Sequence, residues 1–66
     1  MNHDDEKPPV KLIGEDGNAY NIIGLCGRAA RKARWSDEKW QAVQKEMMAS
    51  DYDNLLATAL KYFEVE

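Results

Sequence analysis

Residues 52–63, Tyr-Asp-Asn-Leu-Leu-Ala-Thr-Ala-Leu-Lys-Tyr-Phe, decide the fold of this 66-residue chain. Six apolar residues in this stretch recur at spacings of three, one, three, one and three. Because an α-helix completes a turn in about 3.6 residues, that spacing gathers them into one apolar stripe. Such a stripe must pack against another element in water, so the sequence predicts a helix within a small helical domain. The stripe comprises Tyr52, Leu55, Leu56, Ala59, Leu60 and Phe63.

A second helix is predicted upstream, where apolar residues keep helical spacing from Ala19 to Ala33. We expect it to cover residues 18–33, with the Asn18 side chain capping its first turn. The pair Asp16-Gly17 leaves a hairpin turn open as an alternative, because it lies between two apolar runs. The length of the helical periodicity favours the helix, since a short strand would not produce it.

Two further helix starts are visible in the sequence. Ser36 is the expected N-cap of the middle helix, and Asp37-Glu38 behind it suits the positive end of the helix dipole. Ser50 is expected to begin the last helix, because Ser50-x-x-Asp53 resembles a capping box. The inner stripe of the middle helix comprises Trp40, Val43, Met47 and Met48.

The ends of the chain differ from its helical middle. Residues 1–9 are polar and acidic and close with two prolines, so we expect a flexible acidic tail and one domain over residues 10–66. Val10–Ile13 is a candidate strand that pairs with residues 63–66, where apolar and acidic residues alternate. The predicted fold is therefore mainly α: a small three-helix domain with a two-stranded ribbon joining its ends.

Size and composition narrow the function classes. Sixty-six residues form one domain with a thin core. The single cysteine permits no internal disulfide and favours a reducing, cytoplasmic setting. No apolar run approaches the roughly 20 residues of a membrane span, and the acidic N-terminus lacks the features of a signal peptide. The net charge of −3 argues against a general nucleic-acid binder.

The strongest candidate site is a cluster of positive charge at the end of the first predicted helix. Four cations followed by an aromatic residue form it: Arg28, Arg31, Lys32, Arg34 and Trp35. In one interpretation the cations face water and complement the helix dipole, or pair with acids such as Asp37, Glu38 and Asp51. In another they form a docking surface for an acidic partner, and in a third they grip nucleic-acid phosphates.

Gly24 and Gly27 form a G-x-x-G pair in the same predicted helix, directly after Ile22-Ile23. This arrangement resembles the glycine loop of KH RNA-binding domains, whose glycines let the backbone approach four nucleotides. Leu25-Cys26 stands where that family usually carries polar or basic residues, and helices follow where a KH domain needs a sheet. We therefore favour close helix contact as the reason for both glycines.

The remaining reactive residues predict neither catalysis nor a cofactor. Cys26 lies in the apolar stripe of its helix, so we expect a buried and inert thiol. His3 is the only histidine; with the chain's amino terminus it offers a square-planar copper or nickel site, which we regard as incidental. The acids are scattered along the chain, so the sequence predicts no enzyme and no resident metal.

Two segments carry a family resemblance: residues 11–20, Lys-Leu-Ile-Gly-Glu-Asp-Gly-Asn-Ala-Tyr, and residues 50–56, Ser-Asp-Tyr-Asp-Asn-Leu-Leu. They are similar to a small family of bacterial and phage or mobile-element proteins of unknown function, and the likeness extends over Lys11–Glu66. The resemblance implies a glycine near the position of Arg34 and a glycine-containing lead-in where Ser50 stands here. It implies one independent domain and no particular activity.

Together these patterns predict a small non-enzymatic protein-interaction module with an unidentified protein partner. The alternative is a nucleic-acid-binding accessory protein that uses the cations of Arg28–Arg34. Association into a homodimer is also open, because a core this thin leaves little apolar surface buried within one chain.

Overall fold

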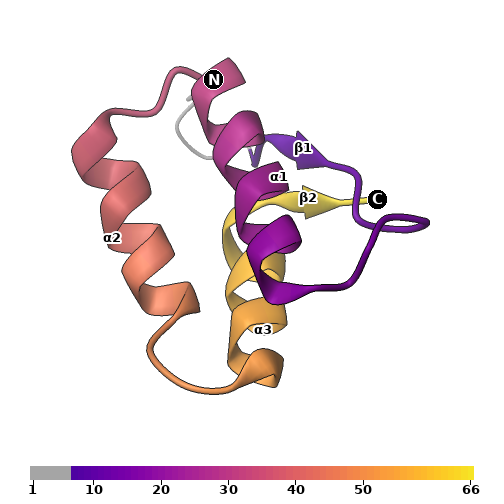
Figure 1. The fold of residues 1–66 in the computed structure, drawn as a ribbon. Helices are drawn as coiled ribbons and strands as arrows, with labels where there is room; N and C mark the ends of the chain where they lie inside the picture. The colour runs from indigo at the N-terminus through magenta and orange to yellow at the C-terminus, as the bar shows by residue number, and fades with distance from the viewer. Residues whose placement is uncertain (1–6) are drawn as a thin grey trace.

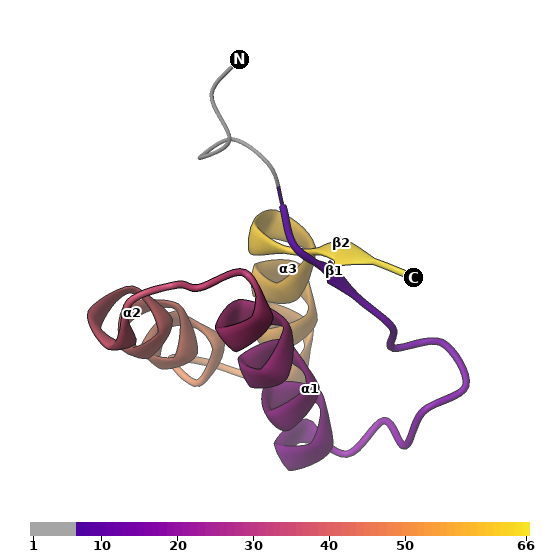
Figure 2. The same ribbon diagram turned by 90° about the horizontal axis from the view of Figure 1, so that it is seen from above.

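The computed structural model describes residues 7–66, which form three helices and a short parallel sheet (Figure 1). The prediction of a mainly α, three-helix domain with a ribbon that joins the ends is confirmed. α2 stands to one side of the molecule, whereas α1 and α3 lie next to the strands (Figure 2). In chain order the elements are β1 (Pro9–Val10), α1 (Ala19–Lys32), α2 (Asp37–Met47), α3 (Tyr52–Tyr62) and β2 (Glu64–Val65).

The first two helices begin at their predicted N-caps. The Asn18 side chain accepts a hydrogen bond from the backbone N–H of Tyr20 at 2.9 Å. Ser36 Oγ accepts one from the N–H of Lys39 at 3.1 Å. Each bond satisfies a backbone donor that has no partner within its own helix. Since α1 follows its cap directly, the hairpin alternative for the preceding turn is wrong.

The third helix begins one residue later than predicted. A side-chain oxygen of Asp51 accepts a hydrogen bond from the N–H of Asn54 at 3.0 Å, so Asp51 is the N-cap. The predicted capping box of Ser50 with Asp53 is therefore wrong. A carboxylate at this position satisfies an orphan donor and also complements the positive end of the helix dipole.

The two strands pair in parallel, Pro9 opposite Glu64 and Val10 opposite Val65. The contact between the chain ends continues beyond the strands, because the carbonyl of Glu66 accepts hydrogen bonds from two further N–H groups. Their distances are 2.7 Å and 2.9 Å, and the donors are Leu12 and Ile13. The predicted pairing of residues 10–13 with 63–66 is therefore confirmed, with the regular strands confined to two residues each.

The packed domain starts before residue 10, where the sequence placed its boundary. Pro8 is buried, and its carbonyl accepts a hydrogen bond from the N–H of Glu64 at 2.9 Å. Lys7 is tied to the same end of the molecule, because its Nζ donates to the carbonyl of Leu60 at 2.9 Å. Residues 7–9 therefore belong to the fold. The rest of the predicted acidic tail, including His3, lies outside the described residues.

Only part of the predicted α3 stripe is buried. Leu55, Ala59 and Phe63 are at most 4% exposed, whereas Tyr52 and Leu60 are 43% and 58% exposed. The buried arc of α3 is narrower than the stripe and rotated toward Thr58, which is buried and donates its hydroxyl hydrogen to the carbonyl of Asn54 at 2.8 Å. That bond explains how a polar residue enters the core, since its hydroxyl has a partner.

The core joins all three helices to the strands. Met48, predicted in the inner stripe of the middle helix, is exposed: it is the C-cap residue of α2 and lies about 100° around the helix axis from the buried Met47. Tyr20 is also exposed, so its ring does not contribute to the core. Within residues 7–66 the core cluster comprises ten buried apolar side chains besides Pro8: Val10, Ile22, Cys26, Ala29, Ala30, Val43, Met47, Leu55, Ala59 and Phe63.

Candidate functional site

The end of α1 determines where the predicted cluster of cations lies. Two hydrogen bonds of 3.0 Å close the helix, from the N–H of Arg34 to the carbonyl of Arg31 and from the N–H of Trp35 to the carbonyl of Ala30. This pair of bonds is a Schellman motif, whose left-handed position usually holds glycine. Here Arg34 occupies it with φ at 64°. The backbone therefore turns sharply at Arg34, and Trp35 packs against the buried Phe63.

Trp35 is held against the core by two contacts. Its ring centroid lies 5.0 Å from that of the buried Phe63, with an angle of 30° between the planes. The Nζ of Lys39, in the first turn of α2, lies 4.4 Å from the Trp35 ring centroid in a cation–π contact. Trp40 meets the same Phe63 edge-on at 6.5 Å. The half-buried Trp35 ring therefore has a fixed place between α1 and α2.

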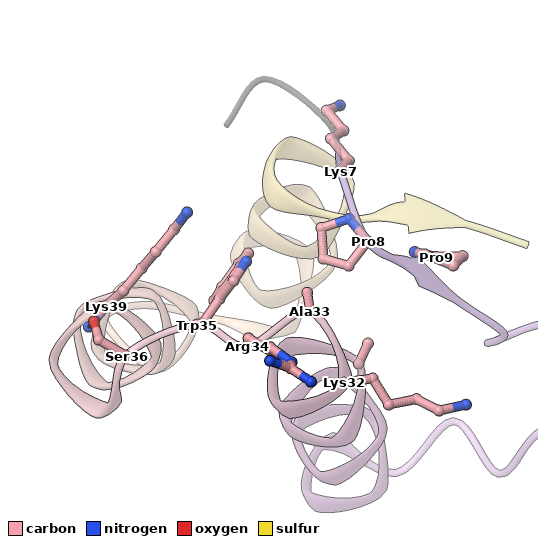
Figure 3. A pocket seen from close by; sticks show the side chains of 10 residues that line it. Lys7, Pro8, Pro9, Lys32, Ala33, Arg34, Trp35, Ser36 and Lys39 are labelled. Carbon is pink, nitrogen blue, oxygen red and sulfur yellow. Dashed lines mark hydrogen bonds between the residues drawn. The ribbon is translucent and has the colours of Figure 1, made fainter. Parts of the chain in front are cut away.

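A cavity of about 650 Å³ opens beside Trp35 (Figure 3). We call it the basic pocket, because within residues 7–66 its charged lining consists of four cationic side chains and no carboxylate: Lys7, Lys32, Arg34 and Lys39. The Trp35 ring lies between the Ser36 end of α2 and the segment Pro8-Pro9, so an aromatic ring and two rigid pyrrolidine rings form its apolar walls (Figure 3). Such a pocket has the charge and shape to hold an anionic group beside an apolar one.

Two of these four cations are already engaged. Lys7 Nζ donates to the Leu60 carbonyl, and Lys39 lies over the Trp35 ring. The side chains of Lys32 and Arg34 make no hydrogen bond or ion pair with any of residues 7–66. They are the groups of the basic pocket that can bind an anion without losing a contact seen in this part of the chain.

The predicted pairing of the cluster with acidic residues of the chain is wrong within the described part. The ion pair found among residues 7–66 joins Lys61 to Glu46 at 3.0 Å, on α3 and α2. Asp37 stands in the first turn of α2 and Asp51 caps α3, so both serve helix starts. The cations of the cluster are exposed, as the water-facing interpretation predicts.

The structure divides the predicted cluster in two. Lys32 and Arg34 line the basic pocket, whereas Arg28 and Arg31 line a second cavity of about 290 Å³ between α1 and α2. We call this second cavity the α1–α2 groove. Trp35 lines both cavities. The walls of the groove also include Ile23, Gly24, Gly27, Asp37, Trp40 and Gln44.

The two glycines of α1 have different surroundings. A Cβ at Gly27 would lie 3.1 Å from Cζ2 of Trp40, so this glycine permits close packing of α2, as predicted. A Cβ at Gly24 would meet nothing within 4 Å, and the residue is exposed, so close helix contact does not explain it. Both glycines lie inside a helix rather than in a loop, which removes the resemblance to the KH glycine loop.

Cys26, which the sequence predicts to be a buried and inert thiol, is fully buried in the core. Loss of water around the thiol raises its pKa to about 11, so the thiol stays protonated at neutral pH. Within residues 7–66 no three side chains of the metal-binding types gather closely enough to hold an ion. None of the helices in the same range has the length and apolar character to span a membrane.

Sequence reasoning missed Lys7, Pro8 and Lys39 as parts of the site. Lys39 follows Trp35 by four residues, a spacing that does place side chains together when both lie on one helix. Trp35 precedes α2, so that signal was ambiguous. Nothing local marks Lys7 and Pro8, because the pairing of β1 with β2 brings them to the end of α1.

Comparison with known proteins adds no assignment to this geometry: no protein-family model, no curated protein and no solved structure matches the chain. The family resemblance drawn from residues 11–20 and 50–56 stays a prediction.

Proposed function

We propose that this chain is a non-enzymatic interaction module whose basic pocket binds an acidic segment of a partner protein. The observation that supports the proposal is the gathering of four cations around the fixed ring of Trp35, with no carboxylate from the described part of the chain among them. The whole chain carries a net charge of −3, so this pocket is a local reversal of sign. Complementary charge speeds encounter and orients a partner, and an aromatic wall supplies the apolar area that interface cores require.

Nucleic acid is the competing ligand, since it also presents regularly spaced anions. Single strands are usually held by bases that stack on exposed aromatic rings. In this structure Trp35 packs on Phe63 and carries the Lys39 ammonium over its ring, so a base could stack there only by displacing Lys39. This arrangement favours an acidic protein segment over a nucleic acid.

We further propose that the protein is cytoplasmic and that it can form a homodimer. A cytoplasmic location is supported by the single cysteine, which is buried and unpaired. Exposed apolar residues such as Leu60 and Tyr52 leave room for a homodimer. Analytical ultracentrifugation of the purified chain tests that second point directly, since a homodimer doubles the sedimenting mass.

The binding test uses a fluorescein-labelled peptide of Asp and Glu residues, a matched Asn/Gln peptide, and single- and double-stranded oligonucleotides. We expect the acidic peptide alone to raise the fluorescence anisotropy. The Kd for it should increase about thirtyfold in the double variant Lys32→Gln/Arg34→Gln, since each of the two lost charge-assisted contacts contributes on the order of 1 kcal/mol.

The matched control is Lys11→Gln/Lys45→Gln, which removes the same charge at exposed positions that line neither cavity. It should leave the Kd nearly unchanged. If both double variants increased the Kd equally, the loss of binding would be explained by net charge and not by the basic pocket. Tight oligonucleotide binding that falls steeply with salt would establish the competing function instead.

A further inference from the structure

We infer that the α1–α2 groove receives one large apolar side chain of the same acidic partner segment that the basic pocket binds. The inference rests on the proposed function and specifies the partner's chemistry. The partner is an acidic segment that carries an apolar anchor of the size of Leu, Met or Phe.

Gly24 is the first observation that points to a ligand in the groove. Glycine inside a helix lowers stability by about 1 kcal/mol relative to alanine, so its presence at an exposed helical position calls for a reason. Within residues 7–66 nothing lies within 4 Å of the place where a Cβ would stand. Gly24 nevertheless lines the groove, where a missing side chain lets a ligand approach the backbone of α1.

The walls of the groove are the second observation. Trp35, Trp40 and Ile23 supply apolar surface from both α1 and α2, and all three are partly buried. The groove measures about 290 Å³ against 650 Å³ for the basic pocket, so it suits one side chain more than a length of chain. Asp37 and two arginines also line the groove, so its lining combines charged groups with this apolar surface.

Continuity with the basic pocket is the third observation. Trp35 is a wall of both cavities, so a segment that crosses this ring reaches the two together. Arg28 and Arg31 line the groove and offer cations to acids next to the anchor. An apolar anchor surrounded by charged contacts is the usual layout of a protein interface, in which a few buried side chains supply most of the affinity.

The experiment compares two fluorescein-labelled acidic peptides that differ only at one central residue, Leu in one and Ser in the other. Burial of a leucine side chain is worth enough free energy for the Leu peptide to bind about tenfold more tightly. The variant Gly24→Ala places a methyl group at the groove. It should abolish most of that tenfold difference, leave the Kd of the Ser peptide unchanged, and raise the Tm of the chain.

The Gly24→Ala variant separates an effect on binding from an effect on folding, because it is expected to stabilise the helix and at the same time to weaken binding of the Leu peptide. Gln41→Ala is the matched control: it replaces an exposed residue of α2 that lines neither cavity, and both Kd values should stay as in the parent chain. If Gly24→Ala weakens binding of the two peptides equally, or leaves both Kd values unchanged, the groove is not the anchor site.

A second measurement locates the anchor without a substitution. The chain has two tryptophans, so a nitrogen–proton NMR spectrum contains two indole N–H signals to follow, those of Trp35 and Trp40. The Leu peptide should shift the Trp40 indole and the Gly24 amide, and the Ser peptide should not. Equal Kd values for the two peptides, with no shift at Trp40, would overturn the inference and leave the proposed function standing. Absence of binding by either peptide would overturn both.

Discussion

Arg34 lies in the left-handed region of the backbone, with φ at 64°, in the Schellman motif that ends α1. This conformation brings Cβ close to the following carbonyl oxygen and costs roughly 1 kcal/mol for a residue other than glycine. We therefore expect Arg34→Gly to raise the free energy of unfolding by about 1 kcal/mol. Urea denaturation should show a higher midpoint with an unchanged m-value.

Arg34→Ala separates the effect of strain from that of charge. Alanine removes the same guanidinium but keeps a Cβ in the left-handed conformation, so stability should change little. Both variants should weaken binding of the acidic peptide to the same extent, since both lose the cation of the basic pocket. Equal stability of the two variants would show that the backbone at this position is not strained.

Gly27 lies where the Trp40 ring of α2 packs against α1. A methyl group here would lie 3.1 Å from Cζ2 of Trp40, whose ring in turn contacts Phe63. The strain of overpacking, typically about 1–3 kcal/mol, should exceed the gain of about 1 kcal/mol in helix propensity. We expect Gly27→Ala to lower the Tm, whereas Gly24→Ala, in open space on the same helix, raises it. A higher Tm for both variants would contradict the close packing of Trp40.

At the scale of elements, the start of α3 depends on Asp51. Its side chain accepts the N–H of Asn54 and stands at the positive end of the helix dipole. Asp51→Ala should lower the free energy of unfolding by about 1 kcal/mol, as the loss of an N-cap usually does. Ser50→Ala, one residue earlier, should have almost no effect, and chemical denaturation of the two variants distinguishes the two positions. A larger loss of unfolding free energy from Ser50→Ala than from Asp51→Ala would show that Ser50 is the N-cap.

A pH-dependent side-chain contact joins α2 to α3. Glu46 accepts hydrogen bonds from the Tyr62 hydroxyl at 2.8 Å and from Lys61 Nζ at 3.0 Å. The pKa of the Glu46 carboxyl is lowered in the folded chain, mainly by the hydrogen bond from Tyr62 and to a smaller extent by the one from Lys61. Because the folded pKa lies below the unfolded one, the contact stabilises the fold at neutral pH and is lost as the pH falls through the lowered pKa.

The variant Glu46→Gln tests this linkage. The parent chain should lose its stability advantage over the variant as the solution is acidified from pH 7 to below the ordinary glutamate pKa of about 4.3. Thermal unfolding of both chains across that range measures the difference. A constant difference in Tm between them at every pH would show that the ionised carboxylate is not what holds α2 to α3.

At the scale of the whole molecule, local patterns predicted the elements better than their assembly. Helical spacing and capping residues placed α1 and α2 closely, because those signals act within one or two turns. The sequence did not show that Leu60 would stay outside while Thr58 entered the core, since that depends on which neighbours α3 meets. The parallel direction of β1 and β2 likewise follows only from the finished arrangement.

The candidate site shows the same limit. A run of cations at the end of α1 is visible in the sequence, and the structure confirms that its members are exposed. Their division into two sets depends on Trp35, whose place depends on packing against Phe63 far along the chain. Lys7 joins the site through the pairing of the chain ends. Contacts between distant residues leave no periodic signal, so this part of the site could not be predicted.

Phe63 links the core, the chain ends and the candidate site. It is 1% exposed, packs against Trp35 and Trp40, and stands between α3 and β2. Removal of a buried phenylalanine costs about 3–5 kcal/mol, which equals the roughly 3–5 kcal/mol that a core of this size supplies. Phe63→Ala should therefore unfold the entire domain, with loss of helical circular dichroism and of the folded tryptophan fluorescence together.

Leu60→Ala is the matched control for Phe63→Ala, because it truncates an apolar residue of the same segment that is 58% exposed. Its Tm should stay close to that of the parent chain, since substitutions at such surface positions usually change stability by less than about 0.5 kcal/mol. If Phe63→Ala keeps its helical signal and alters tryptophan fluorescence alone, the aromatic contacts form a local cluster and not the centre of one cooperative fold. The basic pocket would then depend on Phe63 for the position of Trp35 and not for the presence of its helices.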